Sequence, residues 1–223
     1  MKLSILIPVL NEEKTIKKVI ERVLLQKSVF EIIVIDDGST DDTLKKLNNI
    51  KNPKLKILKH QKNLGKGAAI QTALKKVIGD YILTQDGDLE YNPDEYIKLI
   101  KKASPSKAVY GSRIKGNNPH AYTRTYLGNT FITALANFLF GTNLTDSYTC
   151  YKLIPTKLAR NLYLKSSGFE IEAEITGKLA KGKTDIIEVP ISFSPRKYEE
   201  GKKIKFKDAI LGTLTYLKIW LGF

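Results

Sequence analysis

Hydrophobic positions in the first half of the chain follow two alternating patterns. Short apolar runs lie at 3–8, 31–35, 55–58 and 81–84, and polar turn residues follow each run. Between the runs, apolar residues recur at helical spacing, as in the series Ile16, Val19, Ile20, Val23 and Leu24. We therefore predict a helix starting after Asn11, which we expect to act as its N-cap, a second helix over 41–49, and a third that the loop 63–67 opens and that runs to about 78. Strands alternating with helices predict an α/β fold with a doubly wound, mostly parallel sheet.

The second half is less regular. Its pattern predicts helices over 126–140, 169–180 and 208–221, and extended segments over 109–113, 148–154 and 186–193. The chain contains no linker rich in Gly, Pro or Ser, no low-complexity tract and no internal repeat. We therefore expect one domain over 1–223.

Composition and charge narrow the classes of function. The chain has 223 residues, a formal net charge of +14 and a single cysteine, Cys150, which excludes an intrachain disulfide. Its first residues are too short and too strand-like for a signal peptide, and no apolar run is long enough to span a membrane. The positive charge favours anionic partners, although lysines on a solvated surface would give the same count. We see no nucleic-acid-binding signature and expect no nucleic-acid partner.

Two pairs of carboxylates directly follow predicted strands. Asp36 and Asp37 follow the second strand, and Asp86 and Asp88 flank Gly87 after the fourth. Ligands in doubly wound sheets bind beyond the carboxyl ends of the strands, so we expect both pairs to converge at one sheet edge. Hard carboxylate oxygens suit Mg²⁺ or Mn²⁺, with Glu90 as a further ligand. Taken alone, an Asp-Gly-Asp triplet is more often an ordinary turn.

Two other segments have both a structural and a functional interpretation. Asp37 is either a helix N-cap or an acceptor for a base N–H or a ribose hydroxyl. The segment 63–67 is either a flexible helix start or a cationic, glycine-rich loop that brings Lys66 close to a nucleotide. It does not match the P-loop pattern, which argues against a nucleotide hydrolase.

Four ordered motifs resemble those of family 2 glycosyltransferases. They are Pro8-Val9-Leu10-Asn11-Glu12, Asp36-Asp37-Gly38-Ser39, Asn63-Leu64-Gly65-Lys66-Gly67 and Asp86-Gly87-Asp88. Further similarity runs through Gly111-Ser112-Arg113, 124–129, 146–152 and 195–203, so the resemblance covers nearly the whole chain. The branch that it resembles most is the dolichol-phosphate mannose synthases and their bacterial relatives that act on polyprenyl phosphates. The resemblance implies a GT-A fold, which is a Rossmann-like single domain.

The resemblance also implies roles for individual positions. Residues 1–110 would form the nucleotide-sugar-binding half and 111–223 the acceptor-binding half. The implied ligands of the nucleotide sugar are Pro8, Asn11, Glu12, Asp37, Lys66, Asp86, Gly87, Arg196 and Lys203. Asp86 and Asp88 would hold Mg²⁺ or Mn²⁺, with Glu90 close by. Arg113, Arg124 and Asn129 would bind the acceptor phosphate, and Asp88, Arg113 and Arg124 are the implied catalytic residues.

The implied reaction is an inverting, metal-dependent transfer of a hexose from a GDP-mannose or UDP-glucose type of donor to a polyprenyl or dolichyl phosphate. Such an acceptor oxygen is already anionic and needs no strong general base, whereas a sugar hydroxyl would need a carboxylate. Glu170, Glu172 and Glu174 are candidates for that base, but a solvated helix face is the better explanation for at least two of them. A saccharide acceptor therefore stays open, as does a non-catalytic sugar-nucleotide-binding module.

The sequence departs from the mannose synthases in two places. Thr149-Cys150-Tyr151-Lys152 stands where they have Ser-Gly, an aromatic residue and arginine, and the loop between Arg196 and Gly201 is longer. Both departures leave the hexose and the acceptor open.

Two apolar segments suggest contact with a membrane surface. The segments 129–140 and 210–223 supply aromatic side chains, and four lysines precede the second segment, namely Lys202, Lys203, Lys205 and Lys207. An apolar helix with a basic flank is typical of an interfacial anchor. Packing of both helices on the sheet or on a second subunit is the alternative explanation. We expect a peripheral protein on the cytoplasmic face of the membrane. We also expect His60 and His120 to be surface residues.

Overall fold

The computed structural model describes residues 1–116, 118, 123–196 and 206–223. Within these residues, seven strands form one sheet in the order β3-β2-β1-β4-β6-β5-β7. The strands are β1 (Leu3–Val9), β2 (Val29–Asp36), β3 (Leu55–Lys59), β4 (Tyr81–Thr84), β5 (Lys107–Ser112), β6 (Lys152–Pro155) and β7 (Asp185–Pro190). Only β6 runs antiparallel to its neighbours, β4 and β5, among the strands of this described sheet. The predicted α/β fold with a mostly parallel sheet is confirmed.

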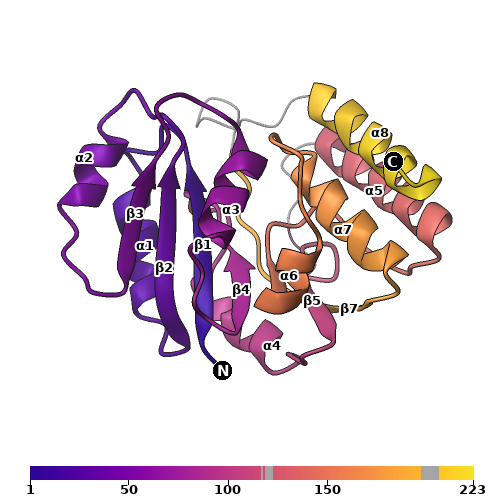
Figure 1. Cartoon of the computed structure of the whole chain (residues 1–223), viewed down its shortest axis with the longest axis horizontal. Coiled ribbons are helices and arrows are strands. Elements are labelled where there is room, and N and C mark those ends of the chain that lie inside the picture. Colours follow the sequence, from indigo (N-terminus) through magenta and orange to yellow (C-terminus); the bar gives the residue numbers. More distant parts are fainter. Residues whose placement is uncertain (117, 119–122, 197–205) are drawn as a thin grey trace.

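Helices cover both faces of the sheet (Figure 1). On one face lie α1 (Ile16–Leu24), α2 (Thr43–Asn48) and α4 (Tyr96–Ile100), and on the other lie α3 (Lys66–Leu74), α6 (Thr156–Asn161) and α7 (Ile171–Lys181). Successive side chains of β1 point to opposite faces of the sheet, so this strand contributes to the hydrophobic core on each face. Leu3, Ile5, Ile7 and Val9 pack with the α1 side, whereas Leu6 packs with the α3 side. Burial on both faces explains why this strand is an almost continuous apolar run.

A third layer lies outside α7. The helices α5 (Thr123–Phe140) and α8 (Phe206–Leu221) run side by side there, as Figure 1 shows. Ile132 and Ala136 of α5, Ala173 of α7 and Tyr216 of α8 form a separate small core. Phe140 also packs inward, with its ring centroid 5.8 Å from that of Tyr216. Both helices were expected from the sequence, and their inner faces are core.

The first helix begins later than expected. It starts at Ile16, and the side chain of Asn11 does not cap it. Asn11 has a positive φ of 49°, and its Oδ1 instead accepts a hydrogen bond from the Thr40 backbone N–H over 2.8 Å. The prediction of an Asn11 cap is therefore wrong, because this side chain fastens the turn after β2.

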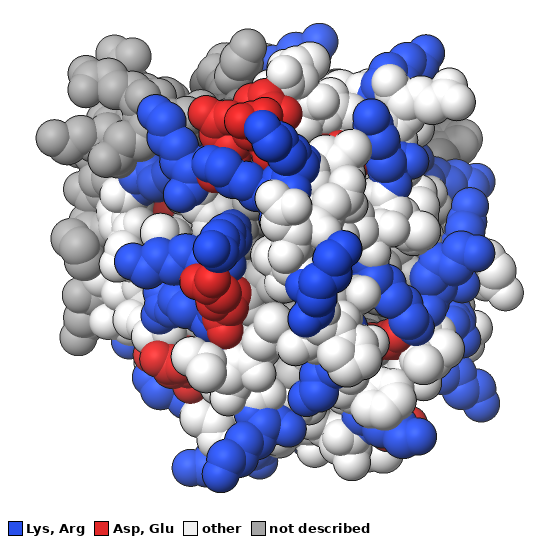
Figure 2. Space-filling model, turned by 90° about the vertical axis from the view of Figure 1, so that its left-hand side faces the viewer, with Lys and Arg blue, Asp and Glu red and all other residues white. Residues whose placement is uncertain are grey.

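Lysine and arginine dominate the side of the molecule that carries β3 and α2. Figure 2 shows them spread over most of that face, with acidic side chains gathered in smaller patches. No helix among the described residues is long and apolar enough to cross a membrane.

Candidate active site

A cleft of about 470 Å³ lies beyond the carboxyl ends of β1, β2 and β4. Its size falls within the range of small-molecule sites. Its lining residues are Pro8, Val9, Leu10, Glu12, Asp37, Asn63, Gly65, Lys66, Asp86, Gly87, Asp88, Glu90, Phe169 and Arg196. Asp37 of the first carboxylate pair and both aspartates of the second therefore line one site, as their positions after parallel strands predicted, whereas Asp36 is fully buried and does not line it. Phe169 and Arg196 reach it from the second half of the chain.

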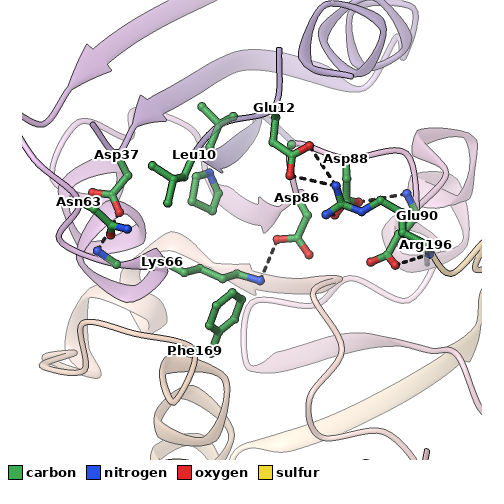
Figure 3. A pocket seen from close by; sticks show the side chains of 14 residues that line it. Leu10, Glu12, Asp37, Asn63, Lys66, Asp86, Asp88, Glu90, Phe169 and Arg196 are labelled. Carbon is green, nitrogen blue, oxygen red and sulfur yellow. Dashed lines mark hydrogen bonds and ion pairs between the residues drawn. The ribbon is translucent and has the colours of Figure 1, made fainter. Parts of the chain in front are cut away.

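The cleft has two chemically different ends. Figure 3 shows Asp37 and Asn63 at one end and Glu12, Asp88, Glu90 and Arg196 at the other, with Lys66 and Asp86 between them. One end therefore carries a carboxylate beside an amide. The other end carries three carboxylates, and the guanidinium of Arg196 forms hydrogen bonds to two of them. A ligand that spans the cleft meets hydrogen-bonding groups at the first end and concentrated charge at the second.

Hydrogen bonds of Gln85 to neighbouring elements hold the loop 85–88 in place. The buried Gln85 accepts hydrogen bonds at Oε1 from the hydroxyls of Tyr96 (2.8 Å) and Tyr151 (2.6 Å). Its backbone N–H donates to the Leu6 carbonyl of β1, over 2.9 Å. At Gly87 an added Cβ would lie 3.0 Å from Cγ2 of Val9, so a side chain would press on β1. Glycine thus allows Asp86 and Asp88 to sit close to the strand ends.

The two aspartates of this loop have different electrostatic environments. Lys66 Nζ lies 2.8 Å from Asp86 Oδ1 and, although burial opposes it, this charge keeps the pKa of Asp86 below its ordinary value. Burial, together with the negative charges of Asp86 and Glu90, raises the pKa of Asp88 to about 7. Negative charge is therefore in excess around Asp88, even with a guanidinium nearby.

Arg196 crosses the acidic end of the cleft. Its Nη2 lies 2.6 Å from Asp88 Oδ2, and its Nη1 lies 3.1 Å from each carboxylate oxygen of Glu12. Its backbone N–H donates to Glu90 Oε1 over 2.7 Å. Burial opposes its charge, but Asp88 and Glu12 raise its pKa above the ordinary value. The predicted donor-site arginine is thus present at the cleft, in contact with the predicted metal ligands.

The carboxylates in and beside this end of the cleft fit a divalent cation that a phosphate-bearing ligand helps to bind. No group of three or more His, Cys, Asp and Glu side chains in the described part of the chain is arranged to hold a metal ion alone. Mg²⁺ in nucleotide sites commonly takes only one or two protein carboxylates and completes its shell with phosphates and water. Asp86 and Asp88 provide two such carboxylates, and a cation there would oppose the burial and the neighbouring negative charges that together raise the pKa of Asp88.

Lys66 belongs to a buried chain of alternating charges. Its Nζ lies 3.0 Å from Glu172 Oε1, and the other oxygen of Glu172 contacts Nζ of Lys152, which is 1% exposed. Burial opposes the charge of Lys66, but Asp86 and Glu172 hold its pKa well above the ordinary value. Lys152 stands at the position where mannose synthases have arginine. It does not line the cleft, but it shares its partner Glu172 with Lys66, which does.

The three glutamates before and within α7 do not form a solvated face. Glu172 and Glu174 are 3% and 4% exposed, which contradicts that interpretation. Glu174 accepts hydrogen bonds from the backbone N–H groups of Lys165 and Ser166 and pairs with Lys178. Glu170 accepts the Gly168 N–H over 2.9 Å. All three carboxylates therefore have structural partners, and none of them lines the cleft.

Arg113 and Asn129, both predicted to bind the acceptor, share one partner. Asp146, which is 0% exposed, accepts from Nε and Nη2 of Arg113 and, over 3.0 Å, from Nδ2 of Asn129. Burial opposes the charge of Arg113, but Asp146 holds its pKa well above the ordinary value. No local pattern in the sequence predicts this partner, because it lies 33 positions from Arg113.

The remaining predicted site residues stand as follows. The side chain of Arg124 and the whole of Lys203 lie outside the described residues. Asn11 follows β1 between Leu10 and Glu12, which both line the cleft, but it is not itself a lining residue. His120 is also outside the described residues, whereas His60, expected at the surface, is only 10% exposed in its side chain and contacts Asp37.

The family model of glycosyl transferase family 2 matches residues 4–163. The chain belongs to this family. The match covers all four motifs named above and every cleft-lining residue except Phe169 and Arg196. The predicted family is therefore confirmed.

Two relatives of the chain are named for lipid-phosphate acceptors. The chain is 28% identical over 211 residues to a dolichol-phosphate mannosyltransferase from Pyrococcus furiosus, covering 91% of this chain and 59% of that protein. It is 33% identical over 213 residues to a UDP-N-acetylglucosamine–dolichyl-phosphate N-acetylglucosaminyltransferase from Methanococcus voltae, covering 84% and 83%. The chain thus spans less than two thirds of the first of these two proteins. These relatives confirm the resemblance to the dolichol-phosphate mannose synthase branch.

The fold has solved counterparts. Glucosyl-3-phosphoglycerate synthase from Mycobacterium tuberculosis, in complex with Mn²⁺, UDP and glucosyl-3-phosphoglycerate, superposes with a TM-score of 0.70 at 20% identity. The match covers 98% of this chain and 79% of that one. At this identity the similarity establishes the fold, and the predicted GT-A architecture is confirmed.

Proposed function

We propose that this chain transfers a hexosyl group, with inversion, from a nucleoside-diphosphate sugar to a polyprenyl or dolichyl phosphate. The observation that carries the proposal is the polarity of the cleft. A hydrogen-bonding end at Asp37 suits a base or ribose, and the charged groups from Asp86 to Asp88 and Arg196 suit a diphosphate with its cation. A nucleoside diphosphate has these two parts in this order.

The chain's own cations would stabilise the leaving diphosphate. Lys66 and Arg196 flank the two aspartates, and both are held in the charged state by neighbouring carboxylates. Asp86 and Asp88 would hold Mg²⁺ or Mn²⁺, which would neutralise negative charge on the departing diphosphate. Phe169 and Pro8 add apolar surface that reduces water around the reacting centre.

A phosphate acceptor fits the groups beyond the charged end. Arg113 lies close enough to Glu90 at the cleft to interact with it electrostatically, and Asp146 fixes the orientation of its guanidinium. Guanidinium binds phosphate through charge-assisted hydrogen bonds, and Arg124 and Asn129 would complete this subsite. A phosphate oxygen needs no general base. This agrees with the contacts of Glu170, Glu172 and Glu174, the candidates for such a base, because each of them binds a neighbouring group of the chain.

We further propose that the chain acts as a peripheral protein on the cytoplasmic face of a membrane. A polyprenyl tail leaves the bilayer at a cost of about 0.8 kcal/mol for each CH₂ exposed to water. The enzyme must therefore approach the surface where the phosphate lies. The outer layer of α5 and α8 exposes apolar side chains that suit this contact, namely Leu127, Phe131, Phe138, Ile210, Leu214, Trp220, Leu221 and Phe223.

A transfer assay tests the proposed reaction. Radiolabelled UDP-glucose, UDP-N-acetylglucosamine and GDP-mannose would each be incubated with the protein, short-chain polyprenyl phosphate, and either MnCl₂ or EDTA. We expect label in the organic phase with one donor and none in EDTA. Label transferred only to a saccharide would overturn the lipid acceptor. Binding of nucleotide without any transfer would identify a non-catalytic module.

A further inference from the structure

His60 connects the nucleotide end of the cleft to the helix behind it. It follows β3 directly, and its backbone N–H donates to the Asp36 carbonyl over 2.8 Å. Its Nδ1 lies 2.6 Å from Asp37 Oδ1, and its Nε2 lies 3.0 Å from Thr72 Oγ1 of α3. The side chains of His60 and Asp37 are only 10% and 5% exposed. The imidazole therefore bridges α3 and the carboxylate that lines the cleft.

Asp37 organises the adjacent wall of the cleft through the same carboxylate. Its Oδ1 also accepts the Leu64 N–H over 3.0 Å, and its Oδ2 accepts the Gly65 N–H over 2.7 Å. A carboxylate offers about four acceptor positions, so these bonds and the imidazole leave one position, on Oδ2. That position can accept one donor from a ligand, such as a base N–H or a ribose hydroxyl.

The backbone on the other side of Asp37 leaves little room for adjustment. Gly38 has φ +77°, and an added Cβ there would lie 2.6 Å from the carbonyl carbon of Lys62 and 2.8 Å from the Asn63 nitrogen. The turn after Asp37 thus packs directly on the loop that carries Asn63. Contact with this loop fixes the backbone of Asp37, but only hydrogen bonds fix the torsion of its carboxylate. Two of these bonds come from backbone N–H groups of the loop, and the third comes from the His60 ring, which is itself bonded to Thr72 of α3.

The protonation of the ring follows from its partners. A carboxylate oxygen only accepts hydrogen bonds, so Nδ1 of His60 carries a proton and donates it to Asp37. Nε2 then accepts from the Thr72 hydroxyl in the neutral ring, or donates to it in the charged ring. Both ring nitrogens are satisfied in either state, so the ring is held in one orientation.

We propose that His60 is a positioning residue of the donor site, which sets the Asp37 carboxylate so that its remaining acceptor position faces the nucleoside. The inference rests on the proposed function, because it takes a nucleoside diphosphate as the ligand of the cleft. His60 acts only through Asp37 and the loop that Asp37 holds.

The test uses substitutions that separate the two ring nitrogens. In His60→Asn the side-chain amide can replace Nδ1 and keep the bond to Asp37. In His60→Gln the amide reaches towards Nε2 and Thr72 instead, and His60→Ala removes both bonds. Titration calorimetry with UDP and GDP on the full chain, with MnCl₂ present throughout, gives the nucleotide affinity. We expect His60→Ala and His60→Gln to bind about tenfold more weakly, the effect of losing one charge-assisted hydrogen bond, and His60→Asn to bind within about threefold of wild type.

Steady-state kinetics provide a second readout. We expect the KM for the donor to rise in His60→Ala while the KM for the lipid phosphate stays unchanged, because Arg113 and its partner lie at the other end of the cleft. Thr72→Val keeps the ring and its bond to Asp37, so it should weaken binding less than His60→Ala does. If His60→Ala binds nucleotide as tightly as wild type, or if His60→Asn loses as much as His60→Ala, the positioning role is overturned. Failure of the wild type to bind either nucleotide would instead overturn the donor site itself.

Discussion

Arg113 binds the carboxylate of Asp146 through two hydrogen bonds, from Nε to Oδ2 and from Nη2 to Oδ1, each of 2.7 Å. The Arg113 backbone N–H donates to the same Oδ2 over 3.0 Å. Asp146 is itself anchored, because its backbone N–H donates to Glu188 of β7 over 2.9 Å. This paired geometry fixes the orientation of the guanidinium, and its remaining N–H groups can bind a phosphate.

The first prediction concerns the acceptor. Arg113→Ala should raise the KM for polyprenyl phosphate and leave the KM for the nucleotide sugar nearly unchanged, and Arg124→Ala should act in the same direction. Each charge-assisted hydrogen bond to the phosphate contributes roughly 1.5–3 kcal/mol, or about tenfold or more in affinity. Arg160→Ala is a matched control, because Arg160 of α6 bonds the Val77 carbonyl away from the cleft. If only the donor KM changed, both arginines would belong to the donor site.

The second prediction concerns stability and pH. Burial opposes the charge of Asp146, but Arg113 holds the pKa of Asp146 below its ordinary value. A depressed folded-state pKa contributes stability that is present above the unfolded pKa, about 3.9, and is lost as the pH falls through the folded value. Asp146→Asn should lower the free energy of unfolding at pH 7 by about 3–5 kcal/mol, because it leaves Arg113 buried without a counter-charge.

Urea denaturation between pH 7 and pH 3 measures both effects. The wild type should lose stability below about pH 4, and Asp146→Asn should lose less over the same range, because its amide does not titrate. Parallel acid profiles for the two proteins would contradict a stabilising role of this ion pair.

The hydrophobic pattern of the sequence predicted the strands, and with them the site residues that directly follow the strand ends. Alternation and apolar runs located the strands, and parallel strands must end at one edge, so Asp37 and Asp86 were expected to meet. The contact between Arg113 and Asp146 could not be predicted, because it depends on how α5 and β6 pack. The burial of Glu172 was missed for the same reason, since both of its lysines lie outside its helix. Helices of five and six residues, such as α4 and α6, are too short to show a period.

The third prediction concerns the cation. Asp88→Asn should largely abolish transfer while the protein stays folded, because a neutral amide replaces a carboxylate ligand. Binding of Mn²⁺ in the presence of UDP, followed by electron paramagnetic resonance, should weaken in parallel. The control is Asp42→Asn, since the Asp42 side chain is 59% exposed and lies at the start of α2. Full metal-dependent activity in the folded Asp88→Asn protein would falsify this assignment.

The fourth prediction concerns the buried charge chain behind the cleft. Glu172→Gln should destabilise the fold by about 3–5 kcal/mol, because Lys66 and Lys152 would both lose their shared counter-charge. Burial lowers the pKa of Lys152, and Glu172 opposes this effect. Loss of the Glu172 charge should therefore destabilise the charged form of Lys152 more than that of Lys66, which keeps Asp86 as a partner. Adding Lys152→Met to Glu172→Gln should restore part of the lost stability. A double-mutant cycle by chemical denaturation measures this coupling, and strictly additive effects would rule it out.

The last prediction concerns the membrane surface. Removing the end of α8 would also remove Tyr216 and Ile219, which are 0% and 6% exposed, so a deletion would damage the core. Point substitutions of exposed residues avoid this problem. Phe138 and Trp220 are 85% and 52% exposed on α5 and α8, and the double variant Phe138→Ser/Trp220→Ser keeps the buried faces intact.

We expect this variant to sediment with anionic liposomes about tenfold less efficiently than wild type, since full burial of one large apolar side chain contributes about 1.5–3 kcal/mol. Its thermal stability and its affinity for UDP or GDP should not change. Ile97→Ser is the control, because Ile97 is equally exposed, at 52%, but lies on α4 on the other face of the sheet. Binding of the wild type should also weaken with added salt, because lysines contribute through charge that ions screen. If the double variant bound liposomes as well as wild type, the α5–α8 layer would not be the docking surface, and the lipid phosphate would have to reach Arg113 from another side.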